Sequence, residues 1–187
     1  MREKTIVFST LFVVGIVCLL WGFWIPAKAV LAQILLQRAW HVSLQTGQPV
    51  KAWPWADSWP IGRLRQPRLG IDLIVLEGAS GEALAFGPGR LEGSSPLSEK
   101  KHPVLAGHRD TSFAFLKDVQ HGDKITVESL ARQDTYTVES TQIVLADELY
   151  LDREQSQTLS LITCYPFDSV LPQTTMRYLV TATGGGG

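Results

Sequence analysis

The segment from Thr5 to Ala27 contains no charged residue and is mostly apolar. It is long enough to cross the hydrocarbon core of a bilayer, which is about 30 Å thick. Residues 1–4 supply positive charge just before it, and the positive-inside tendency then keeps the N-terminus in the cytoplasm. We therefore expect a single-pass membrane anchor with the rest of the chain on the far side of the cytoplasmic membrane.

A cleaved signal peptide is the competing interpretation of this segment, because Ala27-Lys28-Ala29 resembles an A-x-A cleavage site. The apolar run is longer than the roughly 7–15 residues of a signal-peptide core, so we favour an uncleaved anchor. Apolar residues continue with helical spacing from Lys28 to about Leu44. This second stretch either extends the membrane helix or lies on a surface.

The rest of the chain divides by composition into a linker, one domain and a tail. We expect an anchor and juxtamembrane helix over residues 1–45, a Pro/Trp-rich linker over 46–60, a folded domain over 61–183 and a glycine tail over 184–187. Short β-forming runs separated by glycine and proline predict an all-β domain. A net charge of -1 without a basic block argues against nucleic-acid binding.

One cysteine stands at the end of a strongly predicted strand. The run from Leu159 to Cys164 is rich in β-forming residues, and Pro166 ends the strand shortly afterwards. A disulfide to Cys18 would join a membrane interior to this strand, so Cys164 is expected to be a free thiol. A thiolate is a strong nucleophile near neutral pH, but it needs a basic or cationic neighbour.

His108 and Arg177 are the candidate neighbours of that thiol. His108 follows a short predicted strand and opens a polar turn, so it is the candidate acid–base group. Arg177 lies within an otherwise apolar strand, where it either pairs with a carboxylate or stabilises an oxyanion. Guanidinium does not deprotonate near neutral pH, so Arg177 cannot be the base.

A zinc site is the rival use of His102, His108 and Cys164. The chain lacks the closely spaced ligand pairs of structural zinc sites, so we expect no metal and no cofactor there. An acidic run precedes the cysteine strand and is most simply a solvated face, although its carboxylates leave a Ca²⁺ site open. Its members are Asp147, Glu148, Asp152 and Glu154.

These motifs resemble those of the sortases, membrane-anchored cysteine transpeptidases. The run from Ser160 to Cys164 is similar to the sortase motif T-L-x-T-C, with serine at the first position. Ala106-Gly107-His108 and Arg177 also match, in the family's order of His, Cys and Arg. Four segments together resemble the Gram-negative branch, class GN: Trp53–Pro60, Leu84–Gly89, Gly107–Thr111 and Thr163–Asp168. The resemblance covers about residues 50–183.

The resemblance implies a closed eight-stranded β-barrel with short helices, held by a transmembrane helix and facing the periplasm. It implies that Cys164 attacks an LPxTG-like C-terminal sorting signal of a substrate protein and forms a thioacyl-enzyme. Arg177 would hold the oxyanion, His108 would protonate the leaving amine, and Thr163 would flank the bound substrate. An amine acceptor would then resolve the thioacyl group into a new amide.

Two other functions remain open at this point. A cysteine hydrolase or endopeptidase of the same fold would use water as the final acceptor. A membrane-tethered binding domain would use Cys164 only as a core residue, since buried strand cysteines are commonly inert.

Overall fold

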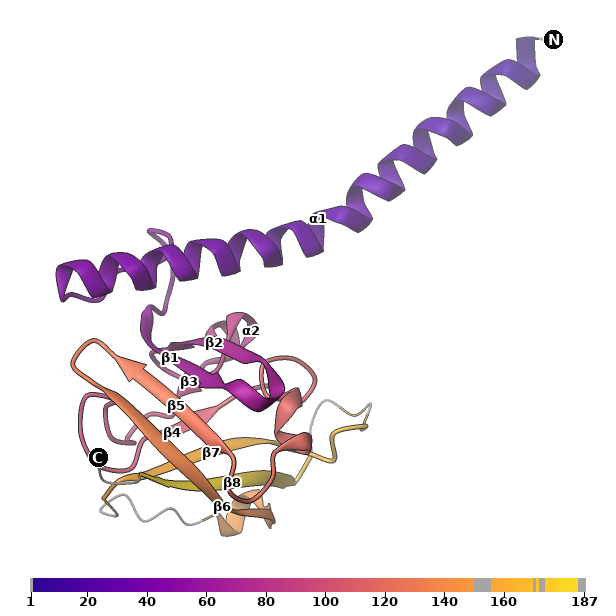
Figure 1. The fold of residues 1–187 in the computed structure, drawn as a ribbon. Coiled ribbons are helices and arrows are strands. Elements are labelled where there is room, and N and C mark those ends of the chain that lie inside the picture. Colours follow the sequence, from indigo (N-terminus) through magenta and orange to yellow (C-terminus); the bar gives the residue numbers. More distant parts are fainter. Residues whose placement is uncertain (1, 150–155, 170, 172–173, 185–187) are drawn as a thin grey trace.

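The computed structural model describes residues 2–149, 156–169, 171 and 174–184, and Figure 1 shows their arrangement. Eight strands in this part of the chain form one closed barrel in the order β1-β2-β3-β4-β7-β8-β6-β5. The predicted all-β, eight-stranded barrel is therefore confirmed. The strands are β1 (Pro60–Gln66), β2 (Ile71–Leu76), β3 (Gly89–Arg90), β4 (Val104–Ala106), β5 (Lys124–Ser129), β6 (Gln133–Leu145), β7 (Thr158–Tyr165) and β8 (Met176–Gly184).

Short helices connect these strands, as expected. They are η1 (Pro67–Leu69), α2 (Gly81–Phe86), η2 (Ala114–Asp118) and η3 (Ala146–Glu148). The helix α2 begins where the Ser80 hydroxyl accepts a hydrogen bond from the Ala83 N–H at 3.2 Å. This side chain satisfies one of the backbone donors that a helix start leaves unpaired.

The barrel interior is filled by side chains that alternate along each strand. Its core contains Leu64, Leu105, Leu159, Leu161 and Val180, all fully buried. Strand β7 is central to this core because β4 pairs with it on one side and β8 on the other. Residues 160–162 of β7 are therefore held by ladders on both edges, and Thr163, Cys164 and Tyr165 are held by the ladder with β8.

Strand β6 is one continuous strand of 13 residues. A shift in the pairing between Val138 and Ser140 accommodates an extra residue without breaking the ladder with β8. At the C-terminus, Gly184 belongs to β8 and pairs with Tyr136, while residues 185–187 lie outside the described part.

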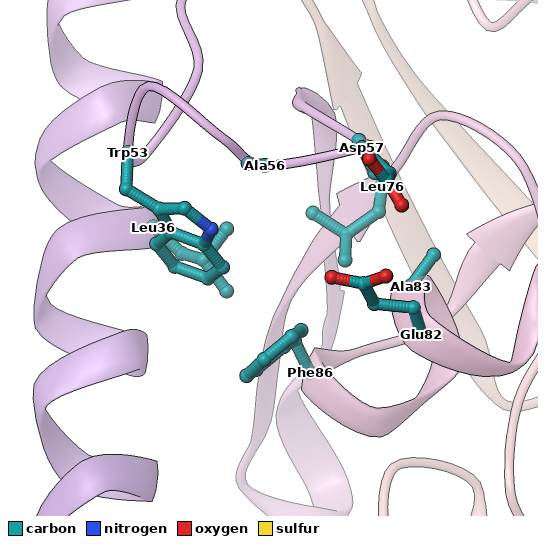
Figure 2. A pocket seen from close by; sticks show the side chains of 9 residues that line it. Leu36, Trp53, Ala56, Asp57, Leu76, Glu82, Ala83 and Phe86 are labelled. Carbon is teal, nitrogen blue, oxygen red and sulfur yellow. The ribbon is translucent and has the colours of Figure 1, made fainter.

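The helix α1 (Arg2–Thr46) is continuous, bends part-way, and lays its second half across the barrel (Figure 1). One stripe of this half is buried: Ala32, Leu36, Ala39, Trp40 and Ser43. Leu36 and Trp40 pack with Ile74, Leu76 and Ala83, and Figure 2 shows Leu36, Trp53 and Phe86 around this contact. The rings of Trp53 and Phe86 lie 5.1 Å apart in an edge-to-face arrangement. The helix thus resembles a membrane span in its length and hydropathy. Its second half also packs on the barrel.

Candidate active site

Cys164 and Arg177 are direct cross-strand partners in the antiparallel pair of β7 and β8. Directly opposed residues project from the same face of a sheet, with Cβ atoms about 4.5–5.5 Å apart. Both side chains are half-buried, and Cys164 is a free thiol. The pairing places a permanent cation next to the one candidate nucleophile on the cysteine strand.

The parallel ladder between β4 and β7 brings His108 to the same end of the sheet. Ala106 pairs with Ile162, and the Gly107 N–H donates to the Ile162 carbonyl at 3.2 Å. His108 and Cys164 each lie two residues further along these strands. Because side chains alternate along β7, Cys164 belongs to the face of Ile162, outside the barrel core. Cys164 and Arg177 therefore share one face of the sheet, and His108 lies in the turn just after β4 at the same edge.

The backbone around His108 is tightly fixed although its ring is exposed. The His108 carbonyl accepts hydrogen bonds from the N–H groups of Phe113 at 2.9 Å and Thr111 at 3.4 Å. A Cβ atom on Gly107 would lie 2.6 Å from the Phe113 ring. A side chain at position 107 would therefore displace Phe113, a fully buried core residue, so glycine is required by close packing.

Thr163 faces the opposite side of the sheet from Cys164 and is 2% exposed. Its hydroxyl donates to the Gly107 carbonyl at 2.7 Å. Together with the Gly107 N–H bond, this ties both backbone groups of Gly107 to β7. Thr163, which precedes Cys164, thus fixes the backbone of Gly107, which precedes His108.

Two arginines hold the loop that joins β7 to β8. Arg177 Nη1 donates to the carbonyls of Thr174 at 2.7 Å and Met176 at 2.9 Å. Arg109 Nη2 donates to the carbonyls of Ser169, at 2.8 Å, and Leu171. Arg109 was not among the residues predicted from the sequence, although its place directly after His108 was an available signal.

An apolar patch lies on the site's face of the sheet, next to the reactive end. Val104, Ile162 and Leu179 form a small buried cluster there, with Leu91 and Leu149 packed against it. A partly water-excluded floor strengthens the electrostatic effect of a nearby cation on developing negative charge. The arrangement can therefore support thiol attack and oxyanion stabilisation at one place.

The segment that carries Phe113 is anchored by an ion pair. Arg68 Nε and Nη2 each lie 2.6 Å from an oxygen of the buried Asp123 carboxylate. The hydrogen bond from Arg68 lowers the pKa of Asp123, and the Gln120 N–H lowers it further. Elsewhere in the core, burial raises the pKa of Tyr136 to about 12, so this phenol stays protonated.

The rival zinc ligands are not brought together. His102 is buried, with Nε2 lying 2.8 Å from the Ser160 hydroxyl, two strand positions before Ile162. Among the described residues, no three His, Cys, Asp or Glu side chains gather closely enough to hold a metal ion. In the acidic run, Asp147 and Glu148 lie in η3, whereas Asp152 and Glu154 lie outside the described residues.

Comparison with known proteins agrees with this fold. The family model of the sortase domain matches residues 64–184. Sortase D of Bacillus subtilis is 31% identical over 121 residues, which cover 64% of this chain and 61% of that protein. Sortase A of Listeria monocytogenes is 29% identical over 109 residues, covering 56% of this chain and 49% of that protein. The solved sortase A from Corynebacterium diphtheriae superposes with a TM-score of 0.61 at 27% identity, covering 71% of this chain and 63% of that chain.

The chain belongs to the sortase family. It spans 61% and 49% of the lengths of the two curated relatives. Sortases named A, C and D are among the proteins that this chain matches. These matches show the family and the fold.

Proposed function

We propose that this chain is a membrane-anchored cysteine transpeptidase in which Cys164, His108 and Arg177 form the reactive centre. The observation that carries the proposal is the register of β7 and β8, which sets Cys164 opposite Arg177. The parallel register of β4 and β7 supports the third member, because it brings His108 to the same edge.

In the first half-reaction, the Cys164 thiol gives its proton to the His108 imidazole and attacks the scissile carbonyl carbon of a sorting signal. The carbonyl oxygen becomes an oxyanion, which the Arg177 guanidinium stabilises. When the intermediate collapses, the C–N bond breaks and imidazolium protonates the departing amine. A thioacyl-enzyme remains on Cys164.

In the second half-reaction, an acceptor amine attacks the thioacyl carbon and loses a proton to His108. The C–S bond breaks, the Cys164 thiol is restored, and a new amide bond forms. Thr163 lies on the face of β7 opposite to Cys164. Its hydrogen bond to the Gly107 carbonyl supports a role in shaping the substrate position, through the backbone next to His108.

The remaining parts of the proposal concern substrate and location. We propose an LPxTG-like signal at the C-terminus of a dedicated substrate protein, and the Gram-negative class GN, on the motif resemblance around Trp53 and Cys164. The first half of α1 would span the cytoplasmic membrane, with the barrel in the periplasm. Its length, its hydropathy and its exposed apolar side chains support this assignment.

The test is the intact mass of the full chain in detergent after incubation with a panel of LPxTG-type peptides. The full chain is preferable to a shortened one because residues 32–43 of α1 bury side chains against the barrel. We expect a mass gain equal to the N-terminal part of one peptide, absent in Cys164→Ala and discharged by an added amine into a new amide product.

Each alternative gives a different result. Loss of the adduct to water, with no amide product at any amine concentration, would identify a hydrolase. No adduct and no cleavage, together with slow alkylation of Cys164 by thiol reagents, would identify a binding domain with an inert cysteine.

A further inference from the structure

The chain carries its charge unevenly, and the division falls close to the end of α1. Residues 28–56 form a basic collar: they hold Lys28, Arg38 and Lys51 and no acidic residue, a net charge of +3. Residues 57–187 hold 12 basic and 17 acidic side chains, a net charge of -5. The collar therefore joins the apolar half of α1, residues 5–27, to an acidic barrel.

The second half of α1 exposes apolar and basic side chains on the surface that does not pack on the barrel. Val30, Leu31 and Ile34 are 61%, 55% and 57% exposed, and Lys28 and Arg38 are also exposed. This side-chain composition is typical of helices that lie in a membrane interface. The same helix buries its other stripe on the barrel, so this surface is held in a fixed relation to the catalytic domain.

An apolar groove opens between this surface and α2. It has a volume of about 360 Å³ and is lined by Ala29, Val30, Gln33, Ile34, Gln37, Ala85 and Phe86. The Gln33 amide donates to the Phe86 carbonyl at 2.7 Å and fixes the two helices beside the groove. At the adjoining end of the apolar half, the Lys28 ammonium lies 4.8 Å from the centre of the Trp24 ring. Tryptophan and lysine together are typical of the headgroup level of a bilayer.

We propose that Lys28, Val30, Leu31, Ile34 and Arg38, with the groove beside Phe86, form a binding surface for anionic phospholipid. This inference rests on the proposed function in one respect, the insertion of the apolar half of α1 in a bilayer. The basic side chains bind lipid phosphates, and the exposed apolar residues and the groove take acyl-chain carbon. An acidic barrel is repelled by the same anionic surface, so the two charges together orient the catalytic domain.

The test places the full chain in nanodiscs of phosphatidylcholine that contain either brominated phosphatidylglycerol or brominated phosphatidylcholine at the same mole fraction. A bimane label is attached at Ile34→Cys in a chain whose native cysteines are replaced by serine. Ile143→Cys on β6 is the matched control, because Ile143 is 51% exposed and lies on the barrel rather than the collar. Leu19→Cys, at a position 64% exposed in the apolar half, reports insertion of the span.

We expect quenching at position 34 to be about two-fold stronger with brominated phosphatidylglycerol, because Lys28 and Arg38 attract anionic lipid to this part of the helix. The preference should disappear in Lys28→Gln/Arg38→Gln and weaken at high salt, while position 143 stays unquenched. Two results would overturn the proposed lipid-binding surface and leave the membrane anchor intact. One is equal quenching at position 34 by both lipids, and the other is no quenching at position 34 while position 19 is quenched. No quenching at position 19 would overturn the anchor as well, independently of the thioacyl assay.

Discussion

The two faces of the sheet formed by β4, β7 and β8 have different tasks. The inner face carries Leu161 and Val180, which are fully buried in the barrel core. The outer face at the same strand ends carries Cys164 and Arg177, which are half-buried and are direct cross-strand partners. Because neighbouring residues of a strand project to opposite faces, one strand supplies both stability and a candidate reactive centre. Substitutions on the two faces should therefore separate activity from stability.

The largest expected effect is on the outer face, at Cys164→Ala. Product formation should fall by at least about 10³-fold because no other side chain on this edge can form the thioacyl bond. Unfolding free energy should change by less than about 1.5 kcal/mol, since the half-buried thiol is small. Peptide turnover and urea denaturation measure the two quantities. Retained turnover would contradict the assignment of the nucleophile.

On the inner face, Leu161→Ala should lower the free energy of unfolding by about 2–5 kcal/mol, through lost burial and the cavity left in the core. Activity per folded molecule should remain close to that of the wild type. Urea denaturation measures the loss, and Ile143→Ala, at an exposed apolar position, is the control with a change within about 0.5 kcal/mol. A loss at Leu161 no larger than the control would show that β7 is not central to the core.

Thr163→Val tests the link between the faces. The substitution keeps the shape but leaves the buried Gly107 carbonyl without the threonine hydroxyl, at a cost of about 1–3 kcal/mol. If that bond positions His108, turnover should also fall by about ten-fold, mainly in kcat. Thr158→Val is the matched control on β7, because Thr158 is buried and its hydroxyl donates weakly to the Ser156 carbonyl. Equal turnover in the two variants would refute the positioning role.

The Arg68–Asp123 ion pair should weaken when the pH falls below the ordinary range of carboxyl pKa values. The folded pKa of Asp123 is lowered, so its contribution to stability is complete above the unfolded value near 4 and is lost as pH falls through the folded pKa. Asp123→Asn should cost about 1–3 kcal/mol at pH 7, with the difference from wild type shrinking toward pH 2. Thermal unfolding across pH measures this, and a pH-independent difference would contradict the linkage.

The candidate site residues could be named from the sequence, but their arrangement could not. Cys164 and His108 were recognisable because each ends a short strand, which is local information. The opposition of Cys164 to Arg177 depends on the register of two strands joined by a long loop, and composition does not specify register. The buried stripe that includes Trp40 was hidden for a related reason, since α1 is apolar on all sides over much of its length.

The most direct test of the shared outer-face site is a double-mutant cycle on single-turnover acylation of Cys164. His108→Ala, Arg177→Ala and the double variant would be compared with wild type by the rate of thioacyl mass gain. Residues that act on the same intermediate are strongly non-additive, so we predict that the double variant loses little more than the worse single variant. Independent losses that multiply, or a wild-type rate in either single variant, would contradict the claim that these three residues work as one site.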